Sequence, residues 1–204
     1  GKPLNAIDAV MCMGASVGMA HGIEKANAEL SKKTVAIIGD STFIHSGITG
    51  LINAAYNGGS LTLIILDNST TGMTGHQDHP ATGYTLKKKE AKRLNLESIC
   101  HSCGADSVRV VDAYDMAQIE KAVREEAESD RVSVIIARRP CVLLEKKTFK
   151  PYKVYENCTG CKVCLKLGCP SISFENGKAK IDASSCTGCG VCGDVCRFGA
   201  MKEA

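Results

Sequence analysis

Short apolar runs alternate with segments of helical spacing over the first two thirds of the chain. The helical segments are residues 47–57 and Tyr114–Ser129, and the apolar residues of the second fall on one face. The apolar runs lack a polar residue at every second position, which is typical of strands buried on both faces of a parallel sheet. These runs are Thr34–Ile38, Leu61–Leu66, Val108–Val111 and Val132–Ile136. We therefore predict an α/β fold with a doubly wound, mostly parallel sheet, in which ligands bind beyond the carboxyl ends of the strands.

From residue 152 onward the pattern changes to short segments around one hairpin. Residues 172–181 form two short apolar-polar runs, and Asn176-Gly177 between them is a strong signal for a tight turn. A basic stretch that contains proline, residues 144–151, precedes this part and is interpreted as a linker. The pattern thus predicts a first domain over residues 1–143 and a small α+β domain over residues 152–204.

The chain opens at Gly1, inside a Gly-rich helical stretch, and not at an initiator methionine. We expect it to be a fragment of a longer polypeptide, with a first domain that is truncated on its N-terminal side.

Composition narrows the class of protein. The chain has 204 residues, 44% of them hydrophobic, and a formal net charge of +3. Its longest apolar runs have strand length, far below the ~18 residues of a membrane helix, and no secretory signal is visible. The Lys87–Lys89 run leads into Glu90, and aromatic residues make up only 4%, so a solvated helix start is favoured over a nucleic-acid patch. No phosphate-binding G-x4-G-K-[ST] loop occurs, which excludes an ATPase of that type.

Eight of the twelve cysteines fall into two runs of three with a fourth further on. Three thiolates at C-x2-C-x2-C grip three corners of a 4Fe-4S cluster, and the fourth cysteine of such a run binds the other cluster. Zinc needs only paired C-x2-C units, and disulfide frameworks belong to small secreted domains, so both alternatives are weaker. The first cluster is assigned to Cys158, Cys161, Cys164 and Cys196, and the second to Cys169, Cys186, Cys189 and Cys192.

Two details depart from the common spacing of such runs. Leu165–Gly168 place four residues before Cys169, and Arg197 follows Cys196 where proline is common. Both change loop shape more than the number of ligands. Because exposed low-potential clusters are damaged by oxygen, we expect a reducing cytoplasm and an anaerobic organism.

A second group of polar residues lies at the predicted carboxyl ends of two strands. Gly39-Asp40-Ser41 follows the first strand and Asn68 follows the second, one βαβ unit later. A carboxylate and an amide oxygen at neighbouring strand ends are suitable ligands for a Mg²⁺ that also binds phosphate. Ordinary loop chemistry is the alternative, because Gly-Asp and Asp-Asn are common after strands.

This spacing resembles the thiamin diphosphate motif, G-D-[GS] followed by Asn. The resemblance implies that Asp40, the Asn68 side chain and the Thr70 carbonyl bind Mg²⁺. The Thr/Gly-rich loop from Thr70 to Gly75 offers hydroxyls and backbone amides to a diphosphate. Met13-Gly14 resembles a segment that lies against the cofactor, with Met13 either an apolar wedge or a core methionine. The predicted cofactor-binding residues are Met13, Gly14, Gly39, Asp40, Ser41, Asn68, Thr70, Met73 and Thr74.

With its two cysteine runs and the segments 39–47 and 73–78, nearly the whole chain resembles the α subunits of indolepyruvate:ferredoxin oxidoreductases. The resemblance implies oxidative decarboxylation of an aryl 2-oxo acid to its acyl-CoA, with electrons passing through two 4Fe-4S clusters to ferredoxin. It also implies a β subunit and coenzyme A as co-substrate. In that family the cofactor-activating glutamate lies in a further N-terminal region, so we expect this fragment to be inactive alone.

Other residues keep two interpretations each. His76 is predicted to be catalytic, orienting the substrate beside the diphosphate, or else to be a surface loop histidine. His79 belongs to the same loop, and His45 follows the Asp40 motif into a helix. Cys100 and Cys103 form a C-x2-C on a helix, where packing is favoured over redox chemistry. Two further cysteines are interpreted as packing residues, Cys12 and Cys141.

Two alternative functions remain open. Pyruvate, 2-oxoglutarate or a branched 2-oxo acid is an alternative substrate, because these residues do not reveal substrate size. A non-enzymatic electron-transfer module is the alternative from a different class. Mg²⁺-dependent binding of thiamin diphosphate distinguishes the enzyme from that module.

Overall fold

The computed structural model describes the whole chain except residues 1–3 and 146–149. Two compact units make up the described part. One spans Val10–Leu144, and the other begins at Glu145 and also includes residues 4–9. Half of the predicted linker, residues 146–149, lies outside the described residues. In the part that is described, no helix is long and apolar enough to cross a bilayer.

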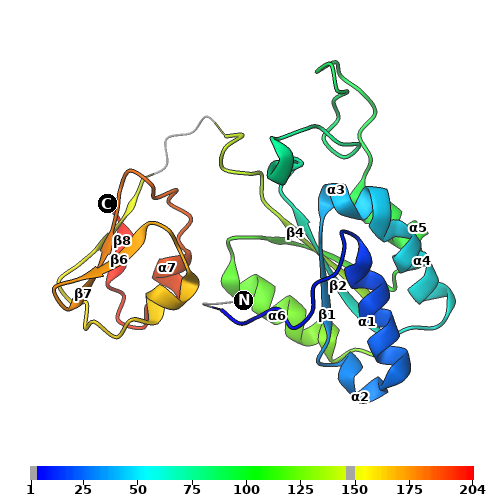
Figure 1. Cartoon of the computed structure of the whole chain (residues 1–204), viewed down its shortest axis with the longest axis horizontal. Coiled ribbons are helices and arrows are strands. Elements are labelled where there is room, and N and C mark those ends of the chain that lie inside the picture. Colours follow the sequence, from blue (N-terminus) through cyan, green and yellow to red (C-terminus); the bar gives the residue numbers. More distant parts are fainter. Residues whose placement is uncertain (1–3, 146–149) are drawn as a thin grey trace. The chain divides into compact units, whose positions relative to one another are not determined.

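Four parallel strands form the sheet of the first unit (Figure 1). The two central strands are apolar at nearly every position because both of their faces are covered. The register between neighbouring strands places Gly39 opposite Leu66, and Asp67 opposite Arg138. The order across the sheet is β1 (Val35–Gly39), β2 (Leu61–Asp67), β4 (Val132–Arg138) and β3 (Ser107–Asp112). The predicted parallel α/β sheet is confirmed.

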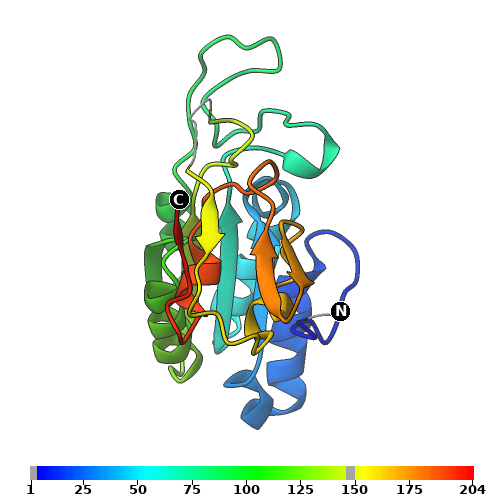
Figure 2. The same cartoon turned by 90° about the vertical axis from the view of Figure 1, so that its left-hand side faces the viewer.

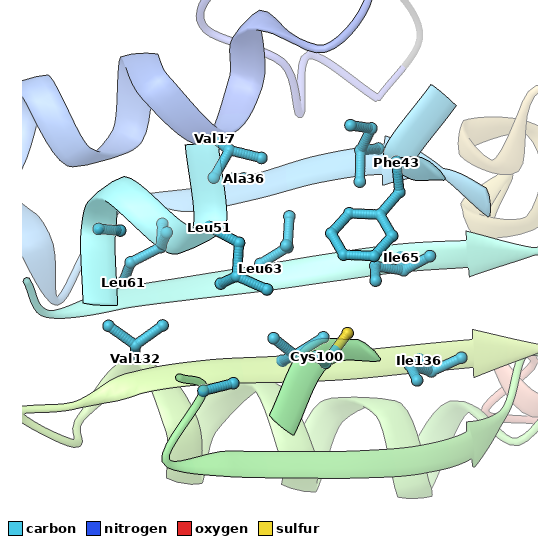
Figure 3. Close-up of a cluster of buried hydrophobic side chains, with 14 of the residues drawn as sticks. Val17, Ala36, Phe43, Leu51, Leu61, Leu63, Ile65, Cys100, Val132 and Ile136 are labelled. Atoms are coloured by element: carbon cyan, nitrogen blue, oxygen red, sulfur yellow. The ribbon is translucent and has the colours of Figure 1, made fainter. Parts of the chain in front are cut away.

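Helices cover both faces of this sheet, as a doubly wound fold requires. On one face, α6 (Met116–Ala127) packs Ala122 against Val111 and Ile135. The main core lies on the other face, where Leu51 and Cys100 point from their helices toward the strands (Figure 3). Each fully buried aliphatic side chain there contributes about 1.5–3 kcal/mol. The helices on that side are α1 (Ala15–Ala26), α2 (Ala28–Ser31), α4 (Ile48–Tyr56) and α5 (Leu96–Ser102).

A continuous helical stretch begins at Asp40, directly after β1. It passes from α3 (Asp40–Thr42) through a π-helical turn, η1 (Phe43–Gly47), into α4. The sequence predicted a helix only from residue 47. The extra residue of a π turn shifts the phase of the apolar pattern, which hides the first turns from a search at 3.6-residue spacing. Turns of this kind occur often at functional sites.

A long loop connects β2 to α5 and projects beyond the carboxyl ends of the strands (Figures 1 and 2). The expected helix start at Lys87–Lys89 is wrong, because Tyr84 and Glu90 pair in an isolated antiparallel bridge across that run. Lys88 has a left-handed φ of 59° at the turn. Three adjacent exposed lysines offer no apolar face to bury, so packing favours no helix there.

The second unit has two small antiparallel sheets, seen in yellow to red in Figure 2. The Asn176-Gly177 turn is confirmed, with left-handed φ values of 48° and 78°. Two short helical segments, η3 (Val163–Leu167) and α7 (Val191–Asp194), carry cysteines, and the loops around them carry the others. The paired strands are β5 (Tyr152–Val154) with β8 (Met201–Glu203), and β6 (Ile172–Glu175) with β7 (Lys178–Ile181). This is the predicted small α+β domain.

Gly14 marks a close approach between the start of α1 and the π-helical turn. Its φ is +89°, and a Cβ on this residue would lie 2.5 Å from the Cβ of Ser46. Only glycine tolerates both the left-handed backbone and this distance.

We expect Gly14→Ala to lower the free energy of unfolding by about 1–3 kcal/mol, because it adds both overpacking and backbone strain. The matched control is Gly18→Ala in α1, where an added Cβ meets nothing within 4 Å. That change should stabilise the helix by roughly 0.5–1 kcal/mol. Anaerobic thermal unfolding of both variants measures the difference, and equal stabilities would contradict the close approach.

Candidate functional site

Asp40 is the buried centre of the polar residues at the carboxyl ends of the strands. Its side chain is 2% exposed, and it occupies the first turn of the helix that follows β1. Oδ1 accepts a hydrogen bond from the backbone N–H of Ser41 at 2.7 Å, and Oδ2 accepts one from that of Ser69 at 3.0 Å. A carboxylate placed at a helix N-terminus is also favoured by the helix dipole.

The loop after β2 carries the other predicted ligands next to Asp40. The Asn68 side-chain oxygen accepts a hydrogen bond from the N–H of Thr70 at 3.1 Å, and Thr70 is buried. Ser69 between them adopts a left-handed φ of 61°. The hydrogen bond from Ser69 to Asp40 thus joins the two predicted halves of the site. Asp40, Asn68 and Thr70 lie together, as the strand order requires.

His79 reaches the same carboxylate from the far end of this loop. Its Nε2 lies 3.2 Å from Oδ2 of Asp40 but makes no well-aligned hydrogen bond, and the residue is only 7% exposed. The backbone N–H of Ala81 donates to Nδ1 at 3.3 Å, which leaves Nε2 as the protonated nitrogen of a neutral ring. Nε2 is therefore a buried donor pointed at Asp40.

A partly buried ion network supports the strand next to Asp40, and the sequence did not indicate it. Nε of Arg138 donates to Oδ2 of Asp67 at 2.6 Å, and its two terminal nitrogens bind Glu97 at 2.8 and 3.0 Å. Hydrogen bonds from Arg138 lower the pKa of Glu97, and that carboxylate raises the pKa of Arg138. The network fixes the residue immediately before Asn68.

Hydrogen bonds close the remainder of the loop on itself. The backbone N–H of Thr71 donates to the Gln77 carbonyl at 3.0 Å, and its hydroxyl donates to the Ser41 hydroxyl at 2.9 Å. The Thr74 hydroxyl donates to the Gln77 side chain at 2.6 Å, whereas Met73 is 92% exposed. The loop keeps the Met73 side chain free and holds its threonines in place.

His76 lies in this loop with a left-handed φ of 64° and is partly buried. Its Nε2 lies 3.8 Å from Sγ of Cys141, whose backbone N–H donates to the Asn68 carbonyl at 2.9 Å. His76 is therefore next to the cofactor loop and contacts a thiol. His45, in contrast, is exposed on the π-helical turn and pairs with the hydroxyl of Ser46.

Two expectations for the N-terminal segment are wrong. Met13 is 63% exposed and precedes α1, so it is not a core methionine. Cys12, expected to pack, is exposed. Both precede the tight contact at Gly14, which carries this segment over the π-helical turn and leaves their side chains uncovered.

The C-x2-C on α5 is a pair of packing residues. Cys100 is fully buried in the main core, and Cys103 packs against that core. Burial raises the pKa of the Cys100 thiol to about 12 and also raises that of Cys103, so neither thiol is poised for thiolate chemistry.

The residues at Asp40 fit a bound Mg²⁺ diphosphate. A carboxylate, an amide oxygen and a backbone carbonyl form a set of hard oxygen donors, and the orphaned Nε2 of His79 is a donor without a partner beside them. Within residues 4–145 and 150–204, no three His, Cys, Asp or Glu side chains converge on one ion-sized point.

The cysteines of the second unit fall into two spatial groups. One surrounds a cavity whose lining also includes Phe174 and Phe198, and it combines the first run with the fourth cysteine of the other run. Burial raises the pKa of the Cys164 thiol, whereas backbone N–H groups of Ala179 and Gly160 lower that of Cys158. The cysteines of this group are Cys158, Cys161, Cys164 and Cys196.

The remaining four cysteines form the second group. Burial raises the pKa of the Cys192 thiol to about 11, with further increases from three neighbouring cysteines. The backbone N–H of Tyr152 also donates to one of these sulfurs at 3.4 Å. The members of this group are Cys169, Cys186, Cys189 and Cys192. Each group thus contains three cysteines of one run and one of the other, which is the arrangement the spacing predicted.

Family models match both units. Residues 2–137 match the family described as thiamine pyrophosphate enzyme, C-terminal TPP binding domain, and residues 150–197 match the 4Fe-4S dicluster domain. Thiamine pyrophosphate is another name for thiamin diphosphate. The chain therefore belongs to the thiamine pyrophosphate enzyme family, and it joins the cofactor-binding domain of that family to an iron-sulfur domain.

Within that class, the chain is similar to indolepyruvate oxidoreductase subunit IorA. It is 44% identical to IorA of Archaeoglobus fulgidus over all of this chain and 33% of that protein. It is 39% identical to IorA of Pyrococcus horikoshii over 98% of this chain and 34% of that protein. The chain thus spans about a third of the length of these relatives. The resemblance drawn from the motifs is confirmed.

A solved structure supports the fold. The chain has a TM-score of 0.55 to a 2-oxoglutarate:ferredoxin oxidoreductase from Magnetococcus marinus, solved with 2-oxoglutarate, coenzyme A and succinyl-CoA. The match covers 63% of this chain and 46% of that one at 15% identity. It is evidence for the α/β fold alone.

We expect serine variants of the cysteines to sort by spatial group and not by sequence run. Cys158→Ser and Cys196→Ser should each remove the same cluster signal, because both sulfurs face one cavity. Cys169→Ser and Cys186→Ser should remove the other. Anaerobic EPR of the reduced protein and iron analysis, with about half of the iron lost in each variant, are the measurements. If the spectrum of Cys196→Ser matched that of Cys186→Ser, it would contradict the exchange of the fourth cysteine between the two runs.

Proposed function

We propose that this chain is the cofactor-binding and electron-accepting part of an indolepyruvate:ferredoxin oxidoreductase. The complete enzyme converts an aryl 2-oxo acid and coenzyme A to the acyl-CoA and CO2 and passes the electrons to ferredoxin. The observation that carries the proposal is the union of a thiamin diphosphate-binding domain with a dicluster domain in one chain, at 44% identity to IorA. Its partners are a β subunit and ferredoxin, in an anaerobic cytoplasm.

In this proposal Asp40, the Asn68 side chain and the Thr70 carbonyl hold Mg²⁺, and the loop to Thr74 binds the diphosphate. Thiamin diphosphate, when bound, supplies the electron sink that 2-oxo acid decarboxylation needs. Met13 supports the cofactor from its exposed position above the π-helical turn. Gly14, Gly39, Ser41 and Met73 complete the lining.

His76 is proposed to orient the substrate, because its ring lies at the edge of the cofactor loop and its neighbour is a polarisable thiol and not a carboxylate. An imidazole N–H there donates one hydrogen bond to a substrate carboxylate or carbonyl. The two cysteine groups bind one 4Fe-4S cluster each, and each cluster accepts one electron.

The decisive experiment is anaerobic reduction of ferredoxin by the full-length subunit with its β subunit and coenzyme A. The substrates compared are indolepyruvate, phenylpyruvate, pyruvate and 2-oxoglutarate. We expect the aryl pyruvates to have the highest kcat/KM. A preference for one of the other acids would replace the substrate class and keep the reaction, and no reduction with any substrate would favour the electron-transfer module.

Asp40→Ala should abolish Mg²⁺-dependent binding of thiamin diphosphate and leave the cluster spectra unchanged. His79→Phe should weaken the apparent Mg²⁺ affinity by about 10–100-fold, because it removes the imidazole whose Nε2 lies 3.2 Å from Oδ2 of Asp40. His79→Gln keeps an N–H donor and should restore most of that affinity. Calorimetric titration of Mg²⁺ in the presence of thiamin diphosphate measures the affinity of all three variants. The control is His101→Ala, at an exposed residue of α5.

A further inference from the structure

We propose that electrons leave this protein at the first cysteine group, through a cationic docking surface for an acidic ferredoxin. The surface consists of Cys161, Lys162, Val163, Lys166, Arg197 and Phe198. It extends the proposed function, on which it rests, by assigning the exit cluster and the face that the partner contacts.

Exposure separates the two cysteine groups. Cys161 is exposed, whereas all four cysteines of the second group are partly buried. Val163 and Phe198 beside it are also exposed, and Phe198 lines the same cavity with half of its surface accessible. A cluster bound through an exposed cysteine lies close to the protein surface. Electron transfer weakens steeply with distance, so this cluster is the better donor to a docked protein.

The two cysteine groups also differ in the charged residues near them, and the cations lie near the first group. Lys162 and Lys166 lie within or next to the first run, and Arg197 follows Cys196, the fourth cysteine of the first group. The ammonium of Lys162 lies 4.6 Å from the ring centre of Phe174, which holds this cation against the cavity wall. The ammonium of Lys178 donates to the Glu156 carbonyl at 3.0 Å, two residues before Cys158. These cations outnumber Glu156, the acidic residue that precedes the first run.

Acidic residues surround the second group instead. Asp194 lies in α7 with Cys192, and Glu203 pairs with Tyr152, whose backbone N–H donates to Sγ of Cys186. Asp182 lies just before this run and binds the hydroxyls of the serines that lead into it. Cations are in excess only beside the first group, so an acidic protein is attracted more strongly to that group than to the second.

The chemistry of the partner follows from this surface. An exposed aromatic and an aliphatic side chain form its centre, and cations form its rim, which is the usual arrangement of a transient protein interface. The rim attracts an acidic carrier and orients it over the exposed cysteine. A reduced cluster bound there would give one electron to one oxidised ferredoxin cluster, so that transfer would need no further reactant.

The test compares two double charge reversals in the full-length subunit with its β subunit. Lys166→Glu with Arg197→Glu changes the proposed surface. Lys153→Glu with Lys202→Glu makes the same change of net charge on the outward face of the β5–β8 sheet, where the two residues pair. Dissociation constants for a purified acidic 4Fe-4S ferredoxin are measured by calorimetry at low and high NaCl, beside the KM for ferredoxin and the rate with methyl viologen.

We expect the first double variant to raise the Kd and the KM on the order of tenfold or more at low salt and to lose most of the salt dependence. The control variant should stay within about twofold of wild type. Methyl viologen reduction and the EPR spectra of both clusters should be unchanged in each, because the small acceptor needs no docking face.

Equal effects of the two double variants on the Kd, or no effect of the first, would overturn the docking surface. The proposed function would still stand if the protein reduced methyl viologen in the presence of substrate. If wild type reduced neither acceptor, the proposed function would fail, and the calorimetric Kd values would still decide whether an acidic carrier binds at this face.

Discussion

The carboxylate of Asp40 is the point at which three segments of the first unit meet. It begins the helix after β1, it accepts the N–H of Ser69 at the start of the cofactor loop, and it faces Nε2 of His79 at the end of that loop. A buried carboxylate without partners is very unfavourable, so these contacts also determine where the loop can close. The position of the loop therefore depends on a side chain at the start of the helix after β1.

The end of the loop is itself held by the core. Ala81 is buried in the main apolar cluster, and Nε of Arg93 donates to its carbonyl at 2.7 Å. His79, two residues earlier, cannot move away from Asp40 without disturbing that anchor. The donor that faces the carboxylate is thus positioned by hydrophobic packing, which is a more rigid support than a loop alone.

In the second unit, the exchange of the fourth cysteine makes each group depend on both cysteine runs. Gly160 in the first run has a φ of +70°, and a Cβ there would overlap the Gly177 carbonyl at the turn between β6 and β7. The hairpin therefore packs directly on the first loop. Neither loop can adopt its conformation independently, so loading of one cluster is expected to favour the fold that binds the other.

Features encoded locally were predictable from the sequence. The strand segments, the Asn176-Gly177 turn and the grouping of the cysteines follow from short patterns whose physical meaning does not depend on the rest of the chain. The βαβ spacing also placed Asp40 beside the loop of Asn68. In each of these cases the residues that matter are close in sequence or lie at the ends of adjacent strands.

Contacts between distant segments were not predictable in this way. Arg138 binds Asp67 and Glu97 only because β4 lies next to β2, and the strand order is not written in any local pattern. The facing of His79 and Asp40 depends on the path of a long loop without periodicity. The exposure of Cys12 and Met13 depends on one glycine contact with the π-helical turn, and the π turn itself obscured the helix that contains it.

The two cysteine groups of the second unit differ in exposure and in nearby charge, and this difference gives the electrons of the proposed reaction a direction of transfer. Oxidation of a 2-oxo acid to an acyl-CoA and CO2 releases two electrons, whereas a 4Fe-4S cluster accepts them one at a time. Two clusters in one small unit can hold both electrons of a turnover. Nearby cations stabilise a reduced, more negative cluster and nearby carboxylates destabilise it. With both clusters bound as proposed, the first cysteine group would favour the added electron more than the second, and the electron would collect at the group whose Cys161 is exposed and whose neighbouring cations attract an acidic acceptor.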